Sequence, residues 1–137
     1  MATQSAVTAP GTKAAIAQAA YKAYETKDRA ALEAIIADDF HFTSPLDNRL
    51  DRATYFKVCW PNSEVMAGFK NIYEFEKGDQ AIIVYEASTS TGKQFRNSEV
   101  HTVRAGKLVA TEVYFGWDLP HKVAVGTHVE NQGQGHG

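Results

Sequence analysis

A glutamate and a histidine stand two residues apart in the most strand-like stretch of the chain. Glu99 and His101 belong to residues 93–117, which predict two long strands joined by a tight turn at residues 104–106. Because side chains alternate across a strand, both side chains point to the same face of the sheet. Histidine is the usual general base near neutral pH, and a carboxyl group can stabilise developing charge. The pair therefore predicts either a proton-transfer site, with both residues catalytic, or polar side chains that only stabilise the core.

The face that carries this pair is otherwise rich in apolar residues. Counting outward from the turn, with Val103 opposite Lys107, assigns it Phe95, Asn97, Glu99, His101, Val103, Val109, Thr111, Val113, Phe115 and Trp117. An apolar face of this kind is expected to point inward, and an acid there needs a partner.

The preceding hairpin predicts a second inward carboxylate. Its two-residue turn is Gly78-Asp79, and counting outward places Tyr73 and Glu86 on the inner face. Asn97 would then lie opposite Glu86, with Glu99 diagonal to it. Two carboxylates at that separation can share a proton. The alternative is a one-residue difference in register, which would turn Glu86 outward.

Other side chains are candidates for contact with a ligand. Aromatic residues are numerous, and most are expected in the core, although Trp60 and Trp117 lie at element ends where a cavity would open. Ser44 and Asn97 either orient a ligand or bind the backbone. The candidate ligand-binding residues are Phe42, Ser44, Phe56, Trp60, Tyr73, Glu86, Asn97, Thr111, Phe115 and Trp117.

No motif predicts a cofactor or a metal. The histidines and the single cysteine lack metal-ligand spacing, and there is no phosphate-binding loop, nucleophile elbow or Cys-x-x-Cys. Cys59 is expected to be an inert packed thiol. The net charge of −2 gives no reason to expect nucleic acid or a membrane as partner. Without a secretory signal or a bilayer-spanning run, a cytoplasmic location is expected.

The elements that must position the candidate site begin with helices. Thr12, Asp28 and Asp51 are predicted caps of three helices. A strand over residues 40–44 follows the second helix, residues 46–50 form a loop, and four strands follow the third helix. The order ααβαββββ predicts an α+β fold in which three N-terminal helices cover a curved, cone-like antiparallel sheet with a cavity beneath them.

One domain is expected between two less ordered ends. Residues 1–11 are predicted to be a flexible arm, residues 12–118 the domain, and residues 119–137 a tail that is disordered or loosely packed. The 137 residues, 44% of them apolar, suit a single core.

Three segments resemble a known superfamily. Residues 35–45 (IIADDFHFTSP), 99–109 (EVHTVRAGKLV) and 112–117 (EVYFGW) are similar to the nuclear transport factor two-like superfamily, in particular its SnoaL-like and ketosteroid-isomerase-like branch. The resemblance implies a cone-shaped domain over residues 12–118. It also implies a cofactor-independent isomerase, cyclase or dehydratase acting on a small apolar molecule, or a module of the same fold that only binds or dimerises.

The resemblance also bears on individual residues. In ketosteroid isomerases a carboxylic acid on the penultimate strand donates a hydrogen bond to the substrate's oxyanion, and Glu99 matches it. The isomerase's general base is replaced here by Ser44, and its first-helix tyrosine falls at Ala20, one residue before Tyr21.

The opposite sheet face is predicted to hold an apolar patch: Ile83, Tyr85, Val100, Leu108, Ala110 and Tyr114. Patches of this kind mark interfaces. Because members of the resembling superfamily commonly pair sheet to sheet, we expect a homodimer through this outer face.

Overall fold

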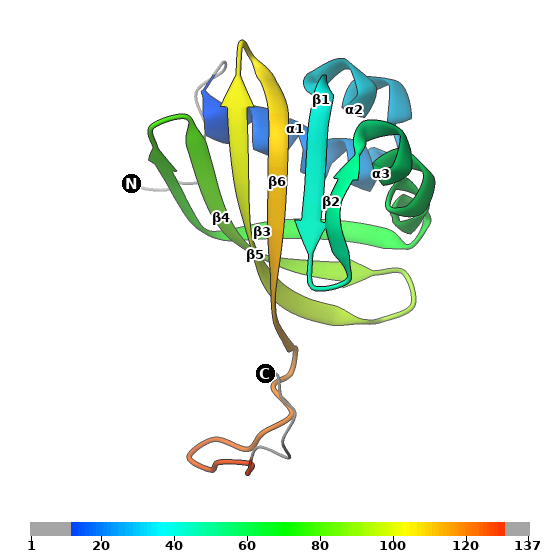
Figure 1. Cartoon of the computed structure of the whole chain (residues 1–137). Helices are drawn as coiled ribbons and strands as arrows, with labels where there is room; N and C mark the ends of the chain where they lie inside the picture. Colours follow the sequence, from blue (N-terminus) through cyan, green and yellow to red (C-terminus); the bar gives the residue numbers. More distant parts are fainter. Residues whose placement is uncertain (1–11, 131–137) are drawn as a thin grey trace.

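Three helices near the start of the chain lie across one face of a single curved sheet (Figure 1). The computed structural model describes residues 12–130. The helices are α1 (Lys13–Thr26), α2 (Arg29–Ile35) and α3 (Arg52–Val58), followed by the short 3-10 helix η2 (Trp60–Glu64). The strands are β1 (Ile36–Ser44), β2 (Asp47–Asp51), β3 (Met66–Lys77), β4 (Gln80–Thr89), β5 (Gln94–Arg104) and β6 (Lys107–Asp118).

Each helix begins at the cap residue that the sequence predicts. The side-chain oxygens of Thr12, Asp28 and Asp51 each accept a hydrogen bond from the backbone N–H three residues further on. These bonds satisfy N–H groups that the first helical turn leaves without an intrahelical partner.

The sheet order is β2-β1-β6-β5-β4-β3, and the predicted fold class is confirmed. Two features go beyond the prediction. The segment expected to be a loop contains β2, an edge strand whose polar sequence DNRLD lacks the alternation that marks a half-buried strand. The sheet is also mixed, because β1 runs parallel to β6 while all other neighbours are antiparallel.

The predicted register of the β3–β4 hairpin is correct only next to its turn. Tyr73 lies opposite Val84 as expected. Beyond it a bulge intervenes, so that Asn71 pairs with Tyr85 instead of Glu86. A bulge adds one unpaired residue, and every side chain beyond it changes face relative to the partner strand.

The predicted pairing of β4 with β5 is wrong by one residue. Asn97 lies opposite Tyr85 and Glu99 opposite Ile83. Tyr85 and Ile83 are buried, so the odd-numbered residues of β4 face the helices. Glu86 therefore points to the outer face, as expected for the alternative in which the register differs by one residue.

The final hairpin keeps its predicted faces between Asn97 and Val103 by two compensating deviations. Its turn is the two-residue loop Ala105-Gly106, with φ of 54° and 78°, instead of the predicted three-residue loop. A register shift between Thr102 and Val103 follows. Each of the two changes alone would turn the following side chains to the other face, and together they leave the faces unchanged. His101 therefore lies opposite Thr111, on the face that the sequence predicts. A further register shift between Arg96 and Asn97 places Trp117 opposite Arg96, so the prediction of an inward Trp117 is wrong.

The apolar patch predicted for the outer face is partly wrong. Ile83, Tyr85 and Leu108 are buried on the inner side of the sheet. Tyr114 is exposed on the outer side. The homodimer through this face remains a prediction.

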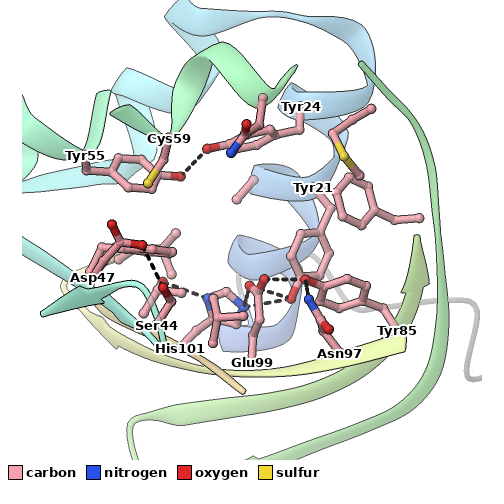
Figure 2. A pocket seen from close by; sticks show the side chains of 18 of the residues that line it. Tyr21, Tyr24, Ser44, Asp47, Tyr55, Cys59, Tyr85, Asn97, Glu99 and His101 are labelled. Carbon is pink, nitrogen blue, oxygen red and sulfur yellow. Dashed lines mark hydrogen bonds and ion pairs between the residues drawn. The ribbon is translucent and has the colours of Figure 1, made fainter. Parts of the chain in front are cut away.

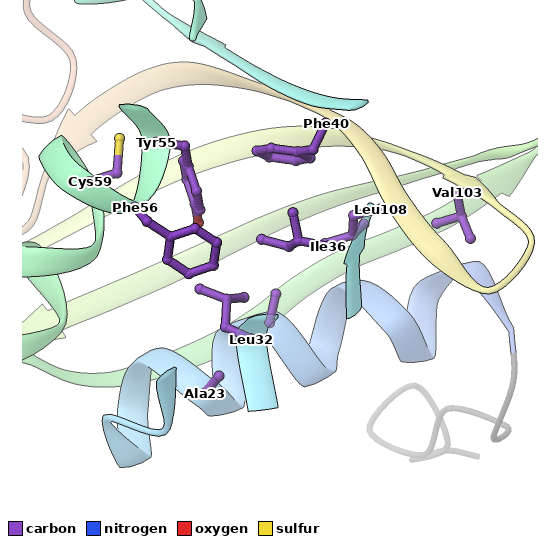
Figure 3. Packing of buried hydrophobic residues seen from close by; sticks show 10 residues of the cluster. Ala23, Leu32, Ile36, Phe40, Tyr55, Phe56, Cys59, Val103 and Leu108 are labelled. Carbon is purple, nitrogen blue, oxygen red and sulfur yellow. The ribbon is translucent and has the colours of Figure 1, made fainter. Parts of the chain in front are cut away.

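Aliphatic and aromatic side chains fill the space between the sheet and helices α2 and α3. Leu32, Ile36, Phe40, Phe56 and Leu108 are all buried in one cluster (Figure 3). We call this cluster the packed end of the concave face. It fixes the helices on the sheet by burying apolar area.

Residues 119–130 contain no helix or strand and run away from the sheet (Figure 1). The predicted arm, residues 1–11, and the last part of the predicted tail, residues 131–137, fall outside the described residues. Within the described range, no helix has the length and apolarity that crossing a membrane requires.

Candidate functional site

A cavity of about 230 Å³ lies between the helices and the concave face of the sheet. Helices α1 and α3 and strands β1, β4, β5 and β6 all contribute side chains to it. Apolar atoms make up most of the lining surface, although about half of the lining residues carry a polar group. Its polar members are Tyr21, Tyr24, Ser44, Asp47, Tyr55, Cys59, Asn62, Tyr85, Asn97, Glu99, His101 and Thr111.

Three ionisable side chains meet on the floor of the cavity (Figure 2). The Tyr21 Oη lies 3.1 Å from Glu99 Oε1 and 2.8 Å from His101 Nε2. The same His101 nitrogen lies 3.1 Å from Glu99 Oε1. We call Tyr21, Glu99 and His101 the acid–base triad. Each pair is within hydrogen-bond distance, so a proton can pass between Glu99 and His101 while Tyr21 remains a donor.

Two further side chains fix the orientation of the triad. Tyr85 Oη donates a hydrogen bond to Glu99 Oε2 at 2.7 Å. Thr111 Oγ1 lies 3.0 Å from His101 Nδ1. The His101 side chain is 2% exposed and the Glu99 side chain 12% exposed. Glu99 is therefore more accessible than His101, which lies behind it.

Helix α1 carries Tyr21 to the triad because of the small residues that precede it. Ala14 and Ala17 are buried on the face that meets the sheet, and small side chains there let the helix lie close to the strands. Tyr21, one turn after Ala17, stacks on Phe69 with ring centroids 5.0 Å apart. The resemblance to ketosteroid isomerases implies that the first-helix tyrosine position is Ala20. The spacing Ala14, Ala17, Tyr21 is a helical stripe that could have identified Tyr21.

Asn97 presents its amide group beside Glu99. Its Oδ1 accepts a hydrogen bond from the backbone N–H of Gly116 at 3.1 Å, which leaves Nδ2 near Tyr85 Oη at 3.5 Å. The approach requires glycine, since a Cβ on Gly116 would lie 2.1 Å from the backbone oxygen of Arg96. The backbone thus holds the amide with its NH₂ group on the cavity side.

The phenols around the cavity are donors and not bases. Burial, and next the charge of Glu99, raises the pKa of Tyr21 and Tyr85 above the ordinary value. Burial also raises the pKa of Tyr24 and Tyr55. All four side chains therefore stay protonated at neutral pH.

Cys59 is a neutral thiol in this environment. Burial, and next the charge of Asp47, raises its pKa to about 12. A nucleophilic thiolate at neutral pH is thus disfavoured. Among the described residues, no group of three or more histidine, cysteine, aspartate or glutamate side chains could hold a metal ion.

Seven of the predicted site residues line the cavity: Phe42, Ser44, Asn97, Glu99, His101, Thr111 and Phe115. Period-two alternation along β1, β5 and β6 accounts for all seven. Asp47, which lies in the segment predicted to be a loop, also lines the cavity, and its Oδ2 accepts a hydrogen bond from Ser44 Oγ at 2.7 Å.

Two of the predicted residues lie on the outer face of the sheet. The Tyr73 residue is 55% exposed and lies on the side of β3 that faces away from the helices. Glu86 forms an ion pair with Arg96. Both misplacements follow from the register changes in β3 and β4.

Three other predicted residues contact protein side chains instead of the cavity. Phe56 belongs to the packed end, and Trp60 meets Tyr24 edge to face at 5.0 Å. Trp117 is 50% exposed and lies against His121. The sequence shows that these positions are aromatic but not which neighbours cover them.

The fold is shared with many solved structures. An NTF2-like protein from Burkholderia thailandensis is 30% identical, with a TM-score of 0.58 over 77% of this chain and 91% of that one. A candidate polyketide cyclase from Sinorhizobium meliloti is 17% identical, with a TM-score of 0.62 over 72% and 92%. IdmH, a candidate polyketide cyclase from Streptomyces antibioticus, is 18% identical, with a TM-score of 0.61 over 74% and 89%.

No family model matches the sequence, and no curated protein matches it. The structural matches nevertheless define the class of protein. The chain belongs to the nuclear transport factor two-like superfamily, and the resemblance that the sequence predicts is confirmed.

Proposed function

We propose that the cavity binds a small, largely apolar carbonyl compound. In this proposal Glu99 exchanges a proton with the carbon atom next to the carbonyl group of the ligand. The observation that supports this most strongly is the acid–base triad on the floor of a mostly apolar cavity. Burying such groups costs free energy unless each has a partner, and here the partners leave one carboxylate within reach of a ligand.

The hydrogen-bond capacity of Glu99 supports its role as the group that receives the proton. An ionised carboxylate offers about four acceptor sites. Tyr21 and His101 lie beside Oε1, and Tyr85 beside Oε2, which leaves Oε2 able to accept once more. A proton gained there can be redistributed, because His101 Nε2 and Tyr21 Oη contact the other oxygen.

Asn97 supplies a donor for the charge that develops on the ligand. When a proton leaves a carbon next to a carbonyl group, negative charge moves to the carbonyl oxygen. The amide of Asn97 lies beside Tyr85 and Glu99, with its oxygen occupied by Gly116. Its NH₂ group is thus oriented before the ligand binds.

The size of the cavity favours a ligand of one or two rings. Pockets for drug-sized ligands are roughly 300–1,000 Å³. Here the volume is about 230 Å³. A steroid is therefore a poorer fit than a one- or two-ring ketone.

A second candidate function is binding without chemistry. It is favoured by Ser44, which stands where related isomerases have a carboxylate and whose hydroxyl already donates to Asp47. The two candidate polyketide cyclases share the fold at less than one-fifth identity, and they do not distinguish the two functions.

Hydrogen–deuterium exchange into 2-tetralone separates the two functions. This two-ring ketone has exchangeable protons beside its carbonyl group, and their loss in deuterium oxide is followed by NMR. We expect the protein to accelerate exchange and Glu99→Gln to reduce the acceleration by about 10²- to 10⁴-fold while 2-tetralone still binds. Binding without exchange would favour the second function, and absence of binding would contradict both.

A further inference from the structure

A second polar group faces the cavity from the helix wall, across from the triad (Figure 2). It consists of Tyr24 on α1 and Tyr55 on α3, whose hydroxyl oxygens lie 2.8 Å apart. We propose that this phenol pair donates one hydrogen bond to a neutral acceptor oxygen at the far end of the ligand. The ligand class is then a ring ketone with a second, uncharged oxygen function opposite its carbonyl group. This inference rests on the proposed function of the cavity.

Hydrogen-bond accounting leaves the pair with one unused proton. Two phenols carry two hydroxyl protons, and the bond between Tyr24 and Tyr55 uses one of them. Within the described part of the chain, neither hydroxyl has another hydrogen-bond partner. A buried donor without an acceptor is costly, and both residues line the cavity. The free site for an acceptor is therefore in the cavity.

Packing holds the pair in place before any ligand binds. The ring of Tyr24 meets Trp60 edge to face with centroids 5.0 Å apart. The ring of Tyr55 contacts Phe40 at 5.0 Å and Phe42 at 5.1 Å. A donor that its neighbours have already positioned binds an acceptor at low entropic cost.

The charge of the lining selects a neutral acceptor. The cavity is lined by the carboxyl groups of Glu99 and Asp47 and by no lysine or arginine side chain. A ligand carboxylate or phosphate would find no lysine or arginine partner and would be repelled by Asp47 and Glu99. An ether, ester or ketone oxygen avoids this cost and still accepts the phenol proton.

The phenol pair and the triad are separate groups that share one ligand space. None of the hydrogen bonds among the described residues joins Tyr24 or Tyr55 to Glu99, Tyr21 or His101. A ligand that contacts both groups must therefore bridge the cavity from the sheet to the helices.

The test uses two ligands that differ at one position and two proteins that differ by two hydroxyl groups. The ligands are 6-methoxy-2-tetralone and 6-ethyl-2-tetralone, in which a methylene replaces the ether oxygen. The proteins are the wild type and the double variant Tyr24→Phe/Tyr55→Phe, which keeps both rings. We expect the preference for the methoxy ligand, measured as a ratio of Kd values by calorimetry, to fall by about two- to ten-fold in the double variant.

A second measurement does not depend on the variant. In the wild type, the hydroxyl-proton NMR signals of Tyr24 and Tyr55 should shift when the methoxy ligand is added and not with the ethyl ligand. An unchanged Kd ratio between the two proteins, or equal shifts with both ligands, would overturn the phenol-pair proposal alone. Failure of both ligands to bind the wild type would overturn it together with the proposed function. Normal binding without deuterium exchange would overturn only the proton transfer.

Discussion

The concave face of the sheet has two ends, of which one is filled by packed side chains and the other lines a cavity. At the packed end, Leu32 and Phe56 fill the space under the helices, and Ile36 and Leu108 of the same cluster also border the cavity (Figure 3). At the other end, which we call the site end, Tyr21 and Glu99 bind each other through their polar atoms and line a cavity (Figure 2).

The two ends differ because aliphatic side chains interdigitate while hydrogen-bonded ones must keep fixed distances. A buried aliphatic side chain contributes about 1.5–3 kcal/mol to stability by leaving water. A buried polar network contributes little net stability but has a single satisfied arrangement. We therefore expect mutations at the packed end to affect stability and mutations at the site end to affect binding and chemistry.

The largest effect on stability is expected for Leu32→Ala. Leu32 is fully buried at the packed end, so the substitution removes contacts and leaves a void. The expected loss is about 2–5 kcal/mol in the free energy of unfolding, measured by urea denaturation. Deuterium exchange into 2-tetralone, corrected for the folded fraction, should be unchanged. A loss of exchange comparable to that of Glu99→Gln would show that the two ends are not separable.

Alkaline pH is expected to destabilise the site end next. The folded-state pKa of Tyr85 is raised above its unfolded value near 10, so the folded protein retains a proton that the unfolded chain loses. Stability is then full below pH 10 and falls as pH rises above it, by about 1.4 kcal/mol per pH unit for each such phenol. Tyr85→Phe should remove about 1.4 kcal/mol of the total stability loss between pH 9 and pH 11, measured by urea denaturation. An unchanged slope would contradict this account of the buried phenols.

A smaller effect on stability is expected when the hydroxyl groups of the phenol pair are removed. Tyr24→Phe or Tyr55→Phe alone leaves one buried hydroxyl without its partner, and each should cost about 1 kcal/mol. The double variant removes both hydroxyls and keeps both rings, so its cost should be less than the sum of the two. Thermal denaturation of the three variants measures this difference. Additive costs would mean that the two hydroxyls do not depend on each other.

Local sequence patterns predicted the helices and one side of the site. Caps at Thr12, Asp28 and Asp51 fixed where helices begin, since the capping bond spans only three residues. Alternation along β5 placed Glu99 and His101 on the inner face, and two deviations of the hairpin cancelled.

The side of the site formed by α1, and the pairing of β3 and β4, could not be predicted in the same way. A bulge in β3 changed the pairing with β4, and the next turn shifted β4 against β5, so Tyr85 replaced Glu86 on the inner face. Which helix residue meets Glu99 depends on how α1 packs across the sheet. Tyr21 was for that reason recognisable only as part of an apolar stripe.

The most direct test of the central claim compares two carboxylates on opposite faces of one sheet. Glu99 lies in the triad, and Glu86 forms an ion pair with Arg96 on the outer face. With 2-tetralone in deuterium oxide, Glu86→Gln should exchange at the wild-type rate and Glu99→Gln at least about 10²-fold more slowly. Equal rates for the two folded variants would contradict the claim that the cavity floor carries out proton transfer.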